Sequence, residues 1–97
     1  MALAASISKA RAFRLDESDR VRIYGKIAMP MRPDTCWDWV GTVNADDKPI
    51  VWYRDNQTLA HRLIYFDFLG VWIDGIRLHR TCEHAECVNP RHRQQGQ

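Results

Sequence analysis

Hydrophobic residues in the first third of the chain recur at the three- to four-residue spacing of a helix. Residues 9–15 and 16–27 are both compatible with helix, and Asp16 or Ser18 can cap the second one. One face of that second helix would be apolar and would carry Val21, Tyr24 and Ile27. We therefore expect a helical segment at the N-terminal end of the chain.

A segment with two prolines, 29–34, separates that region from the rest, because proline cannot continue a helix. The division gives an N-terminal segment, 1–33, and a second region, 34–97. Residues 1–32 carry seven basic and three acidic side chains. This excess of positive charge would suit a polyanion if it gathers on one face, and a solvated surface is the alternative explanation.

The second region begins with strand-like patterns. Residues 36–40, Cys-Trp-Asp-Trp-Val, alternate and predict a strand with both tryptophans on one side. Polar residues and a proline at 44–49 predict a turn. Residues 50–53, Ile-Val-Trp-Tyr, predict a second strand.

A helix is predicted next, over 59–69, with Thr58 as its cap and Gly70 as its end. Its apolar stripe would carry Leu59, Leu63 and Phe66. The residues 71–78 then resemble the approach to a hairpin and its first strand.

The chemically most informative residues are the three cysteines and one histidine. Cys82, Cys87 and His92 follow one another at C-x4-C-x4-H spacing, and Cys36 supplies a third thiol. Three thiolates and one imidazole suit tetrahedral Zn2+. Buried thiols or a small-loop disulfide are the alternative. Such a site would carry a charge of about −1, which nearby arginines such as Arg80 or Arg91 could offset.

Length and composition support a small domain that needs such a stabilising element. Ninety-seven residues bury only a modest core. The chain has no apolar run long enough to span a membrane and no convincing secretory signal. Three cysteines cannot all pair within one chain, so we expect a reduced protein of the cytoplasm.

In this order, the motifs resemble the zinc-containing HNH endonucleases, relatives of the His-Cys box homing enzymes. Residues 36–41, Cys-Trp-Asp-Trp-Val-Gly, resemble the opening of that family, and Ala60-His61-Arg62 resembles its Ala-His-Arg helix. The knuckle 82–92, containing Cys-Val-Asn-Pro-Arg-His, is the specific match. The resemblance implies a fold of class α+β, a zinc-stabilised ββα-metal (His-Me finger) module preceded by the N-terminal helical segment.

The resemblance also implies a catalytic site. His79 would be the general base and Arg62 would contact the scissile phosphate, with Mg2+ or Mn2+ as the catalytic ion. The phosphate backbone would be bound by four arginines: Arg77, Arg80, Arg91 and Arg93.

Two features depart from the family pattern. His79 lies three residues before Cys82, whereas the family's histidine lies two residues before the first knuckle cysteine, so Arg80 takes the usual place. A bulge at 80–81 could turn the His79 side chain back to the expected face of the strand. The family also continues into a helix that holds the metal. Only about two helical turns fit after Pro90, so the ion would have to be held by His84, Asn89 or groups elsewhere.

Two functions therefore remain open. The first is a small DNA endonuclease or nickase. The second is a C-terminally truncated, nuclease-dead relative that binds nucleic acid or protein, for example a phage-encoded inhibitor of a host defence complex. DNA and a protein are the expected partners. A dimer is also conceivable through an apolar face around Ile64, Tyr65, Phe68 and Trp72.

Overall fold

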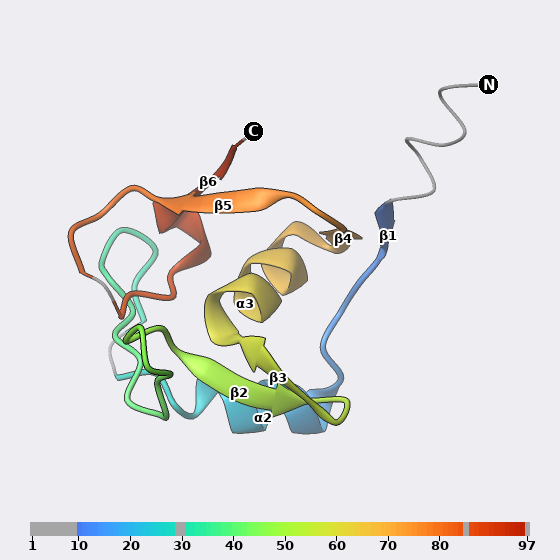
Figure 1. The fold of residues 1–97 in the computed structure, drawn as a ribbon, viewed down its shortest axis with the longest axis horizontal. Coiled ribbons are helices and arrows are strands. Elements are labelled where there is room, and N and C mark those ends of the chain that lie inside the picture. The colour runs from blue at the N-terminus through green and yellow to red at the C-terminus, as the bar shows by residue number, and fades with distance from the viewer. Residues whose placement is uncertain (1–9, 29–30, 85, 97) are drawn as a thin grey trace.

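The computed structural model describes residues 10–28, 31–84 and 86–96. Its strands form three separate antiparallel pairs, β1 with β4, β2 with β3 and β5 with β6. The elements follow in the order β1 (Ala10–Ala12), α2 (Glu17–Tyr24), β2 (Ile50–Tyr53), β3 (Asn56–Leu59), α3 (Ala60–Leu69), β4 (Val71–Ile73), β5 (Arg77–Arg80), the 3-10 helix η1 (Pro90–His92) and β6 (Arg93–Gly96) (Figure 1). The protein is thus a small mixed helix-and-strand structure.

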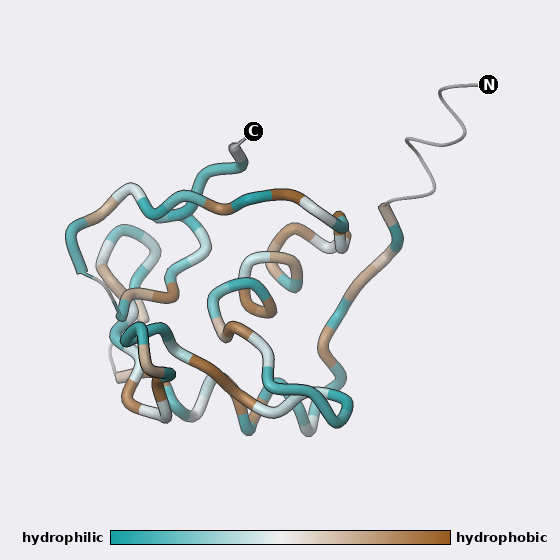
Figure 2. Tube along the Cα trace, in the orientation of Figure 1, coloured by the Kyte–Doolittle hydropathy of each residue, from teal (hydrophilic) through white to brown (hydrophobic). Residues whose placement is uncertain are grey.

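Helix α3 lies at the centre, between the β2–β3 hairpin with α2 on one side and β5 on the other (Figure 1). Leu63, Ile64 and Phe66 are fully buried, which confirms the apolar stripe at Leu63 and Phe66. Burial of each such side chain contributes about 1.5–3 kcal/mol. Figure 2 shows the same partition, with hydrophobic stretches in β2 and α3 and a hydrophilic turn between β2 and β3.

The apolar face proposed for a dimer is mostly internal to the chain. Ile64 and Tyr65 are buried, and only Phe68 of that helix face is half exposed. The packing of α3 against the layers on both sides therefore buries Ile64 and Tyr65, which the sequence alone left available for a dimer partner.

The N-terminal region confirms one helix and corrects the other. Asp16 caps α2 by accepting a hydrogen bond of 2.8 Å from the backbone N–H of Asp19. Residues 10–12 form strand β1 instead of a helix, because β4 offers them an antiparallel partner. The buried residue of α2 is Ile23, whereas Val21, expected on the buried face, is 70% exposed.

A buried carboxylate, Asp67, holds this region against α3. It accepts hydrogen bonds from the N–H of Leu15 (2.9 Å), from Arg20 (3.1 Å) and from the hydroxyl of Tyr24 (2.8 Å). Burial, and after it the hydrogen bond to Asp67, raise the pKa of Tyr24 well above its usual value. Leu15, Ile23 and Ile27 share one hydrophobic core with Leu63 and Ile64. The described part of 10–33 is therefore packed onto the rest of the chain.

Two local predictions for the second region are wrong. Residues 36–40 do not form a strand; they make only single bridges, Trp39 with Ile27 and Asp38 with Cys87. Thr58 lies inside β3, and α3 starts after Leu59 with no side-chain cap. The β2–β3 ladder runs directly into the helix, so the position expected for the cap is used for strand pairing. Gly70 ends α3 as predicted, in the left-handed conformation at φ 82°.

Strand β5 pairs with β6 in a regular register, from Arg77 opposite Gly96 to Arg80 opposite Arg93. A further backbone bond joins the N–H of Thr81 to the carbonyl of His92 (2.8 Å). The predicted bulge at 80–81 is therefore absent from the ladder. In the described part of the chain, no helix is both long and apolar enough to cross a membrane.

Candidate metal centre and cationic pocket

Cys36, Cys82, Cys87 and His92 form one cluster, as the sequence predicted, and their ligand atoms all lie within 4.8 Å of one another. His92 Nδ1 is 3.6 Å from the sulfur of Cys36 and 3.5 Å from that of Cys87. Ordinary Zn–S and Zn–N bonds in a tetrahedron place sulfur and nitrogen about 3.6 Å apart. The four residues could therefore bind a metal ion such as zinc. We call this group the metal cluster.

Backbone contacts bring Cys36 to the other three ligands. The N–H of Val88 donates to the carbonyl of Trp37 (2.8 Å), and the N–H of Trp39 donates to the carbonyl of Glu86 (3.0 Å). These bonds hold the segment after Cys36 against the knuckle, so two regions far apart in sequence meet at the cluster.

Asn89 fixes the other side of the knuckle. Its side-chain oxygen caps η1 by accepting from the N–H of Arg91 (2.9 Å), and Pro90 takes the first helical position, the start that an Asn-Pro pair favours. Its amide also donates to the carbonyls of Pro33 (3.1 Å) and Thr35 (2.6 Å). Asn89 is fully buried with these partners satisfied, so it has no free oxygen for a catalytic ion.

The charge of the cluster is governed by its close sulfurs. Burial and the thiols of Cys82 and Cys87 raise the pKa of Cys36 to about 12. Burial opposes ionisation of Cys82 as well, but a backbone hydrogen bond at His84, the other two thiols and Arg80 together lower its pKa. The sulfurs thus lie so close together that a charge on one thiol opposes ionisation of the others. A bound divalent cation would offset this repulsion.

Two arginines form hydrogen bonds to backbone carbonyl groups of the cluster. Arg80 Nε donates to the carbonyl of Cys82, and Arg93 donates to the carbonyl of Cys87, both at 2.8 Å. Arg80 was expected near the cluster and Arg93 was not. Arg91, the other expected neighbour, lies instead over the ring of Phe68 at 4.8 Å.

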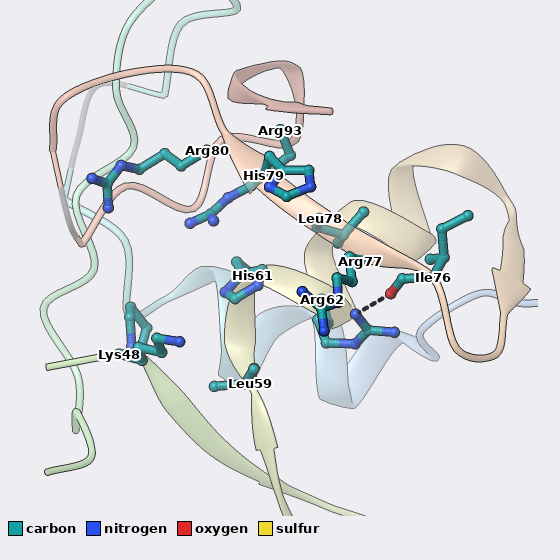
Figure 3. A pocket seen from close by; sticks show the side chains of 11 residues that line it. Lys48, Leu59, His61, Arg62, Ile76, Arg77, Leu78, His79, Arg80 and Arg93 are labelled. Carbon is teal, nitrogen blue, oxygen red and sulfur yellow. Dashed lines mark hydrogen bonds between the residues drawn. The ribbon is translucent and has the colours of Figure 1, made fainter. Parts of the chain in front are cut away.

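A pocket of about 340 Å³ lies between β5, the start of α3 and the start of β2. We call it the cationic pocket, because its lining includes five basic side chains, two histidines and no carboxylate (Figure 3). The ionisable side chains that line it are Lys48, His61, Arg62, Arg77, His79, Arg80 and Arg93.

The two histidines of the pocket differ in position. His79 is exposed, and its ring lies so close to Gly96 that no Cβ would fit there. Since side chains alternate along a strand, His79 and Arg80 point to opposite faces of the hairpin. Gln95 of strand β6 donates to the hydroxyl of Tyr65 in α3 (3.1 Å). The face of the hairpin that carries Gln95 and Arg80 is therefore the one turned toward the helix.

His61 is the histidine on the helix side and is 8% exposed. Burial, followed by the charges of Arg93, Arg62 and Lys48, lowers its pKa to about 3. It is therefore neutral throughout the physiological pH range. His61 of the Ala-His-Arg motif is thus a buried residue whose charged neighbours are all positive.

Arg62 has a structural role besides lining the pocket. It donates to the carbonyl of Ile76 (2.8 Å), and its guanidinium lies 5.1 Å from the ring of Phe66 and 5.8 Å from that of Trp72. Burial lowers its pKa, with Asp74 acting in the opposite direction. The carboxylate of the same helix, Asp67, is paired with Arg20 and not with Arg62.

The remaining candidates lie apart or were missed. His84 is exposed, and its imidazole sits 3.5 Å from Asp38; it is not one of the four clustered ligands, although its backbone carbonyl lies 3.9 Å from the sulfur of Cys82. Lys48 was not singled out, since it belongs to the predicted turn 44–49; only the folded chain places it opposite β5. Among the described residues, the metal cluster is the one group of three or more His, Cys, Asp or Glu side chains close enough to hold an ion.

Comparisons with known proteins add no identification. No protein family, curated protein or solved structure matches this chain. The metal cluster and the cationic pocket are therefore the two features of the molecule that bear on its function.

Proposed function

We propose that this protein is a zinc-stabilised, HNH-like module that binds the phosphate backbone of DNA in the cationic pocket. The observation that carries the proposal is the lining of that pocket, which has five basic side chains and no carboxylate. Phosphate contacts supply most of the sequence-independent affinity of DNA-binding proteins. The small net charge of +2 is no obstacle, because the basic residues are concentrated at one place.

The orientation of the basic groups supports an anion as ligand. Arg80 and Arg93 are held by the carbonyls of Cys82 and Cys87, so part of each guanidinium remains available to a ligand. Arg93 Nε is buried and has no hydrogen-bond partner among the described residues. Its unmet donor favours a ligand rich in hydrogen-bond acceptors.

Zinc in the metal cluster would make the pocket depend on the metal. The ion would hold Cys82 and Cys87 in place, and their carbonyls orient Arg80 and Arg93. We therefore assign zinc a structural role: it stabilises the knuckle and positions the two arginines.

The proposal is tested by fluorescence anisotropy with labelled duplex DNA over a range of salt concentrations. Lys48→Gln combined with Arg77→Gln removes two exposed positive charges from the lining of the pocket. We expect weaker binding and a salt slope smaller by about two. The matched control, Arg22→Gln with Arg32→Gln, makes the same change in net charge outside the pocket. Equal losses in both double variants would contradict the proposal.

A second candidate function is phosphodiester hydrolysis. It is favoured by the order of the HNH family, in which a histidine lies on a strand directly before the knuckle; His79 takes this position, and its exposed imidazole lies on the face of the hairpin opposite Arg80. His79 would act as general base through its neutral imidazole. Among the described residues, no His, Cys, Asp or Glu group other than the metal cluster could hold an ion, so a site for Mg2+ or Mn2+ would have to be completed from elsewhere.

Plasmid cleavage in Mg2+ and in Mn2+ separates the two functions. If the protein is a nuclease, His79→Ala abolishes cleavage and leaves DNA binding intact, because the side chain is exposed. If zinc-loaded, folded protein binds DNA but does not cut it, the binding function stands alone. If it does neither, the remaining hypothesis is the protein partner, such as a host defence complex.

A further inference from the structure

A second groove, of about 480 Å³, lies on another part of the surface, between the chain around β1, the β2–β3 turn and β4. It shares no lining residue with the cationic pocket. We call it the arginine–aromatic groove after six of its residues: Arg11, Phe13, Arg14, Tyr53, Arg54 and Trp72.

Three aromatic rings line the groove, with Phe13 tilted by 72° against Tyr53 and by 58° against Trp72; we call them the aromatic wall. Phe13 lies 6.2 Å from Tyr53 and 5.1 Å from Trp72, measured between ring centroids, and all three rings are only partly buried. A flat ring of a ligand could stack on such a wall and gain about 1–3 kcal/mol for a nucleobase. The rings come from β1, β2 and β4 regions that are far apart in sequence, so the wall exists only in the folded chain.

The rim of the groove is positively charged. Arg11 lies 5.8 Å from the Trp72 ring and pairs with Asp74 at 3.1 Å. Arg54 lies 5.3 Å from the Tyr53 ring. In the described part of the chain, neither Arg54 nor Arg14 has a carboxylate within ion-pair distance. Two of the three guanidinium groups are thus available to an anion.

The backbone at Arg54 is strained. Arg54 and Asp55 have φ values of 51° and 65°, and they form the two-residue turn that joins Tyr53 to its strand partner Asn56. Such turns favour Asn-Gly or Gly-Gly, because residues with a Cβ rarely adopt positive φ. An arginine at the first position therefore costs stability, and strain of this kind tends to persist where a side chain is used.

We propose that the arginine–aromatic groove binds a nucleoside phosphate, with the base against the aromatic wall and the phosphate between Arg14 and Arg54. The chemistry is shared by a free nucleotide and by one unit of a single-stranded nucleic acid. This site goes beyond the duplex-binding role proposed above and stands on different residues.

Isothermal titration calorimetry with adenosine monophosphate and with oligothymidylate tests the site. Arg54→Gly should raise the melting temperature, because glycine adopts positive φ without strain. It should nevertheless lower the affinity for both probes about tenfold, because one charge-assisted hydrogen bond to the phosphate is lost. Asp55→Gly is the matched control: it relieves strain in the same turn and should leave the affinity unchanged or raise it. If Arg54→Gly is more stable and binds as tightly as the unmodified protein, the proposal is overturned.

Partial ligands and a second variant complete the test. Inorganic phosphate and adenosine should each bind far more weakly than adenosine monophosphate; equal binding of phosphate alone would remove the aromatic wall from the site and overturn the proposal. Much tighter binding of oligothymidylate identifies a single strand as the source, and equal binding identifies a free nucleotide. Lys48→Gln with Arg77→Gln should leave nucleotide binding unchanged, so the failure of duplex binding and the failure of this site are distinguishable.

Discussion

Loss of the metal should destabilise the whole fold, because the metal cluster closes a long loop. Cys36 and Cys82 are about 46 residues apart in sequence, and a link across such a loop lowers the entropy of the unfolded chain by an amount worth about 4 kcal/mol at 25 °C. A domain of this size has a total stability of about 5–15 kcal/mol. Metal removal should therefore take away a large share of it and lower the melting temperature by about 16 °C or more.

The assay is thermal unfolding followed by circular dichroism, with zinc content measured in each sample. His92→Ala removes one ligand and should lose about 2 kcal/mol or more. His84→Ala is the matched control, since that imidazole lies in the same knuckle but is 63% exposed and makes only a surface contact with Asp38. It should change stability by less than about 1 kcal/mol. Metal-free protein that melts within a few degrees of the zinc-loaded form would refute the reasoning.

Two further predictions concern buried ionisable groups. Asp67→Ala should lower the free energy of unfolding, measured in urea, by about 3–5 kcal/mol, because it leaves the Leu15 N–H and the Tyr24 hydroxyl without their acceptor. Asp67→Asn should lower it by less. Equal stability of Asp67→Ala and the unmodified protein would exclude this network as a main contact between α2 and α3. His61 has a pKa near 3 in the fold and near 6.5 when unfolded, so the unfolded chain binds the additional proton and stability should fall by up to about 1.4 kcal/mol per unit as pH drops below about 6.5. His61→Gln should flatten that slope between pH 5 and 6.5 when zinc is kept saturating, and an unchanged slope would show that the imidazole is not the group that titrates.

Sequence reasoning succeeded where neighbouring residues decide the structure. The cap at Asp16, the Asn89-Pro90 start of η1 and the left-handed Gly70 all depend on contacts within a few residues. The spacing of Cys82, Cys87 and His92 belongs to the same class, because a short loop can bring these ligands together without any distant partner.

Tertiary structure decided the features that need distant partners. Residues 10–12 could not be recognised as a strand because their pairing residues, 71–73, lie about 60 positions away. Asp67 could have paired with Arg62 on its own helix, but the packing of α2 brought Arg20 to it instead.

The same distinction governs the functional residues. The sequence by itself determined that His79 lies on a strand just before the knuckle, but the face on which it points follows from the register of β5 with β6, where a one-residue shift reverses every side chain. Only the folded chain brings Arg54 into one groove with Phe13 and Trp72. Local spacing fixes which ligands can meet across a short loop, whereas long-range packing fixes which charges and rings gather into a pocket.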